Sequence, residues 1–136
     1  MKPRHSIIEL SEFIDARGRL AFAPEGDHIP FAVRRLFMLY DIPAGTHRGG
    51  HAHRGQHQLL MMMSGACTVS IDDGETATNV DLGRPNQLLH APSMLWLELR
   101  DFTGGAVCAV LASGLFDEDD YIRDYAEFRR LALATS

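Results

Sequence analysis

Four of the seven histidines of this 136-residue chain lie within eleven residues, at positions 47, 51, 53 and 57. One residue separates His51 from His53, so on a β-strand both side chains would point to the same face. Two imidazoles that face the same way inside a protein form either a metal site or an acid–base site, whereas histidines in a solvated loop form neither. Because the cluster adjoins the apolar run 59–63, we expect it at the start of a strand, and the loop interpretation is less favoured.

The metal interpretation is disfavoured by the number of ligands. The spacing His51-x-His53, four residues, Gln58 resembles the first cupin motif, in which the position of Gln58 is normally Glu. In the segment that resembles the second cupin motif, Leu97 stands where the last metal-binding histidine is expected. Of the four ligands in the two cupin motifs, only the two histidines of the first motif are present. A catalytic metal usually needs about three protein ligands. His57 adjoins Gln58, but strand alternation would turn one of the two away. We therefore predict neither a metal nor another cofactor.

Without a metal, paired histidines suit proton transfer. A neutral imidazole, with an ordinary pKa of about 6.5, is a suitable base for removing a proton from a carbon next to a carbonyl. Arg48 and Arg54 flank the pair and would stabilise either a developing enolate charge or a bound phosphate. The residues alone leave both of these roles open.

The elements that position these residues are short strands. Turn signals recur at 15–18, 24–26, 43–45, 72–74, 83–85 and 103–105, and the segments between them are rich in Val, Ile, Leu, Phe and Met. Such regular spacing is typical of an all-β sandwich or barrel. Six segments are expected as strands: 33–40, 59–63, 67–71, 87–91, 95–99 and 106–111.

The end of the chain has a different pattern. Residues 117–133 are acidic first and basic later, which suits the two ends of a helix dipole, and Tyr125 and Phe128 recur at helical spacing. We expect a short C-terminal helix over about 117–133 that packs one face on the barrel. Tyr121, Arg123 and Tyr125 are interpreted as residues that attach this segment to the barrel rather than as ligand contacts.

Three stretches together carry a family resemblance. The first covers residues 15–35, with Asp-Ala-Arg-Gly-Arg-Leu followed by Ile-Pro-Phe-Ala-Val-Arg-Arg. The second covers 48–74 and begins Arg-Gly-Gly-His-Ala-His, and the third covers 111–125 and includes Asp-Tyr-Ile-Arg-Asp-Tyr. In combination they resemble the nucleotide-sugar 3,4-ketoisomerases, metal-independent RmlC-like cupins that act on dTDP-4-keto-6-deoxyglucose.

The resemblance implies a single cupin domain over residues 1–136, an all-β jelly-roll barrel, in a homodimer that exchanges N-terminal strands. The active site would lie inside the barrel and bind a dTDP-linked keto-sugar, with the thymidine diphosphate near the mouth. His51 corresponds to the base that takes the C3 proton beside the C4 ketone, which gives an enediol and then a 3-keto sugar. His53 corresponds to a partner that positions the substrate or relays the proton.

The same resemblance assigns further residues to the substrate. Arg48 matches the arginine before the His-Ala-His motif, and Arg17 and Arg35 match basic positions expected to face the sugar or the diphosphate. Gln58 and Trp96 complete the expected substrate-binding set, with Trp96 as a wall of the barrel.

Two places depart from the family pattern and leave alternatives open. Phe37 and Met38 stand where many relatives have tyrosines, and we expect Tyr40 of the same strand to be the substitute hydroxyl donor in catalysis. Leu97 stands where relatives carry His or Arg, a position expected to help decide which face of C4 is protonated. The alternatives are a non-catalytic sugar-nucleotide-binding cupin, a metal cupin with His57 as third ligand, and an epimerase on a related dTDP-keto-sugar.

Composition disfavours several other classes of protein. The formal net charge is −5, from 13 basic and 18 acidic residues, and the basic residues do not cluster, so no nucleic acid partner is expected. No run of 18 apolar residues and no hydrophobic signal core is present, so we expect no membrane span and a cytoplasmic protein. Cys67 and Cys108 lie in apolar runs and are expected as core residues rather than as a disulfide framework.

Overall fold

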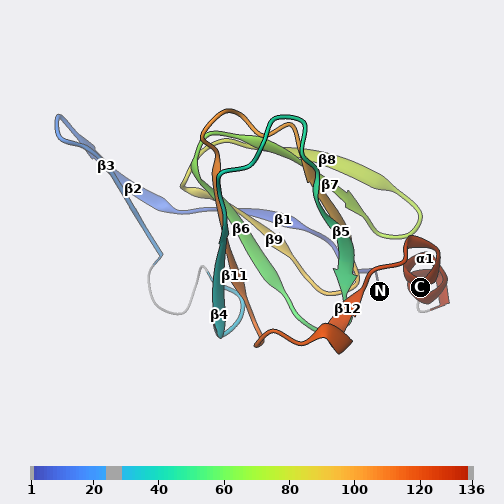
Figure 1. The fold of residues 1–136 in the computed structure, drawn as a ribbon. Helices are drawn as coiled ribbons and strands as arrows, with labels where there is room; N and C mark the ends of the chain where they lie inside the picture. Colours follow the sequence, from blue (N-terminus) through green and yellow to red (C-terminus); the bar gives the residue numbers. More distant parts are fainter. Residues whose placement is uncertain (1, 24–28, 135–136) are drawn as a thin grey trace.

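A computed structural model describes residues 2–23 and 29–134 of the chain. Two five-stranded antiparallel sheets pack face to face in a jelly-roll-like sandwich, from which a two-stranded hairpin extends (Figure 1). The expected all-β fold with one short C-terminal helix is thereby confirmed. The turn predicted at 24–26 lies outside the described residues.

The two sheets have the strand orders β1-β9-β6-β11-β4 and β12-β5-β10-β7-β8. The strands of the first are β1 (Ser6–Glu9), β4 (Arg35–Leu39), β6 (Gln58–Ser64), β9 (Gln87–Ala91) and β11 (Val107–Ala112). Those of the second are β5 (Arg48–His53), β7 (Cys67–Asp72), β8 (Ala77–Leu82), β10 (Trp96–Arg100) and β12 (Tyr121–Ile122). All six strands expected from the sequence are present, within two residues of the expected bounds.

Strand alternation builds the main core between the two sheets. In β7, Cys67, Val69 and Ile71 are buried and alternate with partly exposed polar residues, as the sequence predicts. Leu60 of β6 belongs to the same buried cluster. Cys67 and Cys108 are free thiols in this core, and burial raises their pKa to about 11 and about 12, so both stay protonated.

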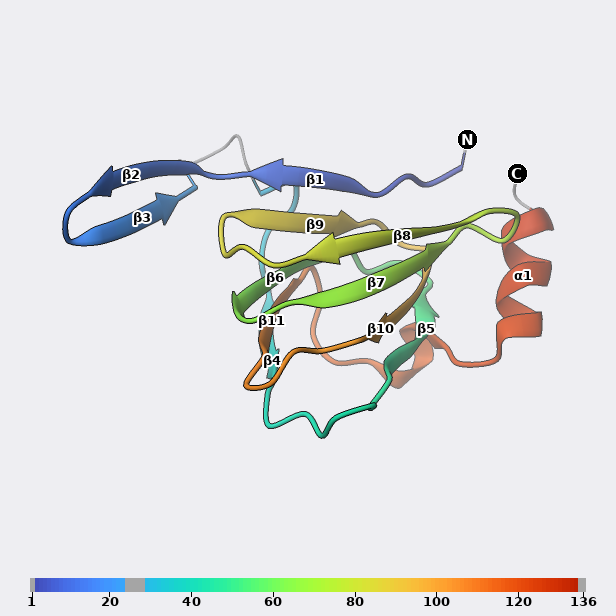
Figure 2. The ribbon, with the colours of Figure 1, turned by 90° about the horizontal axis from the view of Figure 1, so that it is seen from above.

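A hairpin made of β2 (Ser11–Asp15) and β3 (Gly18–Phe22) continues from β1 and points away from the sandwich (Figure 2). The rings of Phe13 and Phe22 stack on it with their centroids 5.6 Å apart. An isolated two-stranded hairpin is marginally stable in water, so this one requires a further surface to pack against. Its large exposed apolar side chains are Phe13, Ile14 and Leu20.

The predicted helix over 117–133 is wrong at its start. The helix α1 (Tyr125–Ala134) is preceded by the short 3-10 turn η1 (Glu118–Asp120) and by β12. Ile122 is extended because it pairs with β5, and Asp124 begins the helix by accepting a hydrogen bond from an amide of the first turn. The run of acidic residues therefore ends before the helix and does not form its first turn.

One face of α1 packs on the second sheet, as expected. Phe128 is fully buried and its ring centroid lies 5.7 Å from that of Trp96. The Tyr125 hydroxyl donates a hydrogen bond of 2.6 Å to the carboxylate of Asp72, the last residue of β7, which attaches the helix to the second sheet as predicted. Within the part of the chain that is described, no helix is long and apolar enough to cross a membrane.

Candidate active site

A cavity of about 190 Å³ opens between the two sheets. An apolar wall with a few converging polar groups is the usual form of a small-molecule site. The volume is below the roughly 300–1,000 Å³ of sites that enclose drug-sized ligands, so one end of a larger ligand fits inside. The apolar side chains of the lining are Phe37, Leu39, Leu60, Leu97, Leu99 and Val110. Its polar side chains are Arg48, His51, Gln58, Tyr121 and Arg123, and Gly49 is the remaining lining residue.

His51 and His53 both lie on β5 and their rings are in contact, as their spacing predicts. The ring centroids are 5.3 Å apart and the ring planes are at 89°. The Tyr121 ring contacts both, with its centroid 4.9 Å from that of His51 and 4.5 Å from that of His53. His51 lines the cavity, whereas His53 is 5% exposed and is not part of the lining. The two histidines therefore have different positions relative to a bound ligand.

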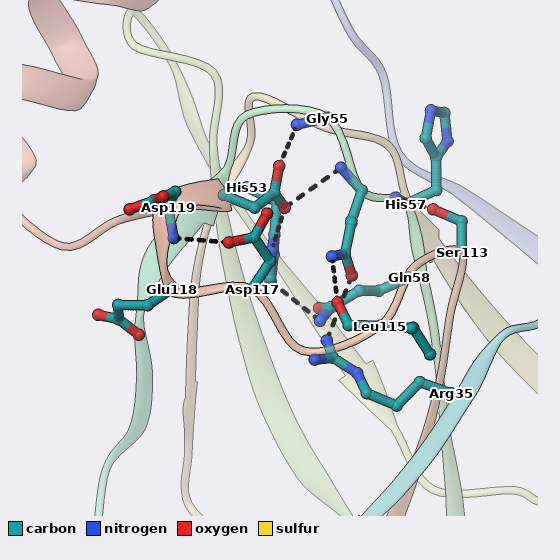
Figure 3. A network of polar contacts seen from close by, with 12 residues as sticks. Arg35, His53, Gly55, His57, Gln58, Ser113, Leu115, Asp117, Glu118 and Asp119 are labelled. Atoms are coloured by element: carbon teal, nitrogen blue, oxygen red, sulfur yellow. Dashed lines mark hydrogen bonds and ion pairs between the residues drawn. The ribbon is translucent and has the colours of Figure 1, made fainter.

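Hydrogen bonds fix the His53 ring at both nitrogens (Figure 3). Its Nδ1 lies 2.8 Å from Asp120 Oδ2, and its Nε2 lies 3.0 Å from the Gln58 side-chain nitrogen. Because the carboxylate can only accept, we assign the ring proton to Nδ1, and the Gln58 amide then donates to Nε2. The Gly55 amide donates to the other Asp120 oxygen at 2.8 Å. With both nitrogens engaged, His53 is suited to positioning its neighbours rather than to taking a proton.

Burial keeps both imidazoles neutral. Burial lowers the pKa of His51 to about 4, and the nearby His53 and Arg123 act in the same direction. Burial also lowers the pKa of His53, against the opposing effect of the Asp120 carboxylate. A backbone hydrogen bond to Gly49 partly opposes the lowering of the pKa of His51. A neutral histidine on the wall of an apolar cavity can act as a base.

Tyr121 and Arg123 also line the cavity, although the sequence analysis assigned both to attachment of the C-terminal segment. β12 pairs with β5 so that Tyr121 lies opposite His53. In an extended segment, residues two apart share a face, which places Tyr121 and Arg123 on the same side. The spacing of Tyr121 and Arg123 in the Asp-Tyr-Ile-Arg-Asp-Tyr motif is compatible with a strand, but the segment was predicted to be a helix, so their shared face was missed.

Arg48 and Gln58 line the cavity as expected, whereas Arg35 is not part of the lining. Arg35 donates a hydrogen bond of 3.3 Å to the side-chain oxygen of Gln56. Its guanidinium carbon is 5.4 Å from the ring centroid of Phe37 and 5.8 Å from that of Phe116. Arg35 therefore links the cavity wall to the loop that precedes η1.

Three further expected residues do not reach the cavity. Tyr40 is 63% exposed, because strand alternation on β4 gives the inward position to Phe37. Trp96 packs against α1 rather than the cavity. Arg17 lies at the tip of the hairpin, where its guanidinium pairs with Asp15 at 2.7 Å. The tyrosine that lines the cavity is instead Tyr121 of β12.

His57 does not join His51 and His53. Its ring points away from Gln58 (Figure 3), and its Nδ1 lies 3.1 Å from Nε2 of His90. Across residues 2–23 and 29–134, no three His, Cys, Asp or Glu side chains are grouped closely enough to hold a metal ion. The metal-cupin alternative with His57 as third ligand therefore lacks its ligand set.

Comparisons with known proteins agree with one another. Residues 3–132 match the family described as "FdtA: WxcM-like, C-terminal". The TDP-4-oxo-6-deoxy-alpha-D-glucose-3,4-oxoisomerase of Aneurinibacillus thermoaerophilus is 36% identical over 126 residues, which cover 93% of this chain and 91% of the relative.

Solved structures give the same result. A 3,4-ketoisomerase from Helicobacter canadensis has a TM-score of 0.90 and 37% identity, with 95% of this chain and 97% of the other covered. QdtA, a sugar 3,4-ketoisomerase from Thermoanaerobacterium thermosaccharolyticum in complex with TDP, has a TM-score of 0.92 and 29% identity, with 96% of each chain covered. The chain therefore belongs to the FdtA family of sugar 3,4-ketoisomerases.

Proposed function

We propose that this protein converts dTDP-4-keto-6-deoxyglucose to a dTDP-3-keto-6-deoxyhexose. The Aneurinibacillus relative is named for this sugar nucleotide, and QdtA binds TDP. In the reaction the C3 proton leaves, an enediol forms across C3 and C4, and a proton is added at C4 while the C3 hydroxyl becomes the ketone. No atom is gained or lost, and no oxidant or reductant is required.

His51 is the base in this proposal, and its place on the largely apolar wall of the cavity is the observation that carries it. A pKa of about 4 leaves the His51 imidazole neutral at neutral pH, so it can accept the C3 proton. Because C3 and C4 are adjacent, the same imidazolium then returns a proton to C4. One residue serves both steps.

Gln58 and Tyr121 hold the reacting oxygens in this proposal. Both side chains line the cavity beside His51. Hydrogen bonds from them to the substituents at C3 and C4 would stabilise the negative charge that develops on the enediolate. His53 and Asp120 act as positioning residues, since they reach the cavity through the Gln58 amide.

The keto-sugar occupies the cavity and the nucleotide extends beyond its mouth, beside Arg48. Phe37 and Leu97 give the wall no proton donor of their own, so the face of C4 that is protonated depends on the position of His51. The product configuration at C4 follows from which face of the enediol the imidazolium meets.

The active unit in this proposal is a homodimer with exchanged N-terminal strands. Leu36 and Met38 of β4 are 59% and 52% exposed, and the projecting hairpin adds further exposed apolar side chains. Apolar surface on this scale is rarely left open to water. Exchange of the N-terminal strands would pack the hairpin on the partner subunit and bring Arg17 to the cavity of that subunit. A monomer in light scattering at micromolar concentration would contradict the dimer.

Deuterium exchange tests the proposed reaction. In D₂O, wild-type protein and dTDP-4-keto-6-deoxyglucose should give a 3-keto product with deuterium at C4, seen by NMR. His51→Asn should reduce this rate by roughly 10²–10⁴-fold while TDP binding, measured by calorimetry, stays within a few-fold. We also expect the activity to survive dialysis against EDTA. TDP binding with neither conversion to a 3-keto product nor exchange would indicate a binding protein, and exchange at C5 would indicate an epimerase, so either result refutes the proposal.

A further inference from the structure

Two histidines outside the cavity are in contact on the outer face of the first sheet. His57 immediately precedes β6, and His90 lies near the end of the neighbouring strand β9. Nδ1 of His57 is 3.1 Å from Nε2 of His90, and the ring centroids are 5.4 Å apart with the ring planes at 19°. Leu89 and Ala91 belong to the core, so His90 between them faces outward. The histidine pair, His57 and His90, is partly buried there.

The histidine pair contacts an apolar segment that leads into β4. Residues 29–33 are Ile-Pro-Phe-Ala-Val, so their side chains can attach the segment only by packing. The ring centroid of Phe31 lies 6.1 Å from the centroid of each histidine ring. The backbone of the segment reaches the sheet at Arg34, whose amide donates a hydrogen bond of 2.9 Å to the Ala112 carbonyl. Since β4 lies at the edge of its sheet, the packing of Phe31 on the histidine pair helps to hold the start of this strand.

The contact within the histidine pair depends on its protonation state. When both imidazoles are neutral, one ring nitrogen donates a hydrogen bond and the other accepts it. After one proton is added, an imidazolium donates to a neutral imidazole, which is a charge-assisted hydrogen bond. After a second proton, two N–H groups and two positive charges face each other across the 3.1 Å contact, so the rings must separate. Burial lowers the pKa of His90, and a positive charge on His57 acts in the same direction.

The elements around the histidine pair bring little negative charge to it. β6 and β9 contribute no further titratable side chain. β1 places Ser6 beside the pair and its acid, Glu9, at the far end of β9. Ser113 follows β11, and its hydroxyl accepts a hydrogen bond of 2.9 Å from the His57 amide. Arg34 is exposed at the end of the apolar segment and would add positive charge. A doubly protonated pair would therefore separate into water rather than be neutralised by a carboxylate of these elements.

We propose that the histidine pair attaches the segment 29–34 to the first sheet in a pH-dependent way, and that the attachment opens when both imidazoles are protonated. The attached state binds fewer protons than the open state, in which the two imidazoles are protonated independently. The attachment therefore weakens as the pH falls below about 6.5, the ordinary pKa of histidine. Neither histidine lines the cavity, so the inference does not depend on the proposed reaction.

Amide hydrogen exchange of the full chain at pH 7.5 and pH 5 tests the proposal. The reporter is the Arg34 amide, which the attached segment holds against the Ala112 carbonyl, and the reference is the amide of Val69 in the core strand β7. Both rates are corrected for the intrinsic effect of pH on exchange. In the wild type, the Arg34 rate relative to the Val69 rate should rise by roughly 3–30-fold at pH 5, the order of magnitude of repulsion between two adjacent charges in water.

Two single substitutions separate the charge from the hydrogen bond. His57→Gln and His90→Gln each keep a donor and an acceptor at the contact but allow at most one positive charge there. In either variant, the rise in the relative Arg34 rate at pH 5 should shrink to about twofold or less. His47→Gln is the matched control, because His47 is an exposed histidine outside the pair, and this variant should keep the wild-type rise.

An NMR titration of the imidazole carbons in the wild type requires no variant. The histidine pair should titrate in two coupled steps, and the lower step should lie below the ordinary pKa of about 6.5. Independent titration of both rings near pH 6.5 would overturn the proposal. A relative Arg34 rate that does not change with pH would overturn it too, as would the same rise in His90→Gln as in the wild type.

Discussion

Replacement of Asp120 by asparagine probes the hydrogen-bond network behind His51, the proposed base. The Asp120 carboxylate accepts hydrogen bonds from His53 Nδ1 at 2.8 Å, from the Gly55 amide at 2.8 Å and from the Gln56 amide at 3.4 Å. Asn has nearly the same shape but one acceptor oxygen. If that oxygen stays with Gly55, the new amide group faces the N–H groups of His53 and Gln56.

The expected loss of stability follows from the hydrogen-bond donors that the substitution leaves unpaired. A buried donor without a partner costs about 1–3 kcal/mol. His53 can avoid this by moving its proton from Nδ1 to Nε2, but Gln58 must then turn its amide to present oxygen to the ring. The Gln56 contact is long and contributes least. We therefore expect Asp120→Asn to lower the stability by about 1–3 kcal/mol, which corresponds to a fall in Tm of roughly 3–12 °C.

The loss of activity should be larger than the loss of stability. A turned Gln58 presents a different group to the cavity, so the hydrogen bonds to the enediolate are misplaced. We expect kcat to fall by roughly 10²–10⁴-fold at a temperature where the variant is fully folded. The assays are turnover by NMR, Tm by circular dichroism, and ¹⁵N NMR of the imidazoles, which distinguishes the Nδ1–H from the Nε2–H tautomer of His53.

Asp124→Asn is the matched control. Asp124 is a carboxylate of the same segment that accepts a hydrogen bond from the Glu127 amide at the start of α1, and it has no place in the cavity. Because Asn caps a helix about as well as Asp, both the stability and kcat of this variant should stay near the wild-type values. The reasoning is refuted if Asp120→Asn keeps kcat within about threefold of wild type, or if its His53 tautomer is unchanged.

Four further outcomes are expected. The acid limb of kcat/KM should lie near pH 4, the pKa of His51 in the free enzyme, and a limb near pH 6.5 would contradict the burial argument. The stability should also decrease as the pH falls from about 6.5 toward 4, because the unfolded chain binds the His51 proton first. Gly49→Ala should lower Tm more than Gly50→Ala: both glycines have positive φ, but only at Gly49 would a Cβ lie 2.7 Å from the Leu97 carbonyl oxygen. Leu97→His should change the C4 configuration ratio of the product in NMR, and an unchanged ratio would exclude a role for this position.

Segments with strong apolar alternation were predictable from the sequence. β7 and β9 begin at the expected residues, since their buried residues include Val69 and Ile71 in β7 and Leu88 and Leu89 in β9. β8 was not predicted, because it is mostly exposed and polar. β2 and β3 were also missed, because they lack a buried face in the single chain. Strands that pack little within their own subunit carry little of the pattern from which strands are predicted.

The site was predictable where it depends on one strand and was missed where it depends on pairing. His51 and His53 share β5, so their spacing alone brought them together. Asp120, Tyr121 and Arg123 come from a segment whose charges and apolar spacing imitate a helix. They reach the histidines because β12 forms against β5, a contact between distant parts of the chain that local patterns do not encode.

The apolar wall that keeps His51 neutral also makes it a weaker base than an ordinary histidine. Part of this weakness comes from the positive charge of Arg123, and Glu118 partly offsets it. A diphosphate bound at the mouth of the cavity would add negative charge near His51 and raise its pKa. The acid limb of kcat, which reports the enzyme–substrate complex, should therefore lie at higher pH than that of kcat/KM. Bound substrate would therefore make His51 a stronger base. In the free protein the lower pKa of His51 keeps its imidazole unprotonated at neutral pH.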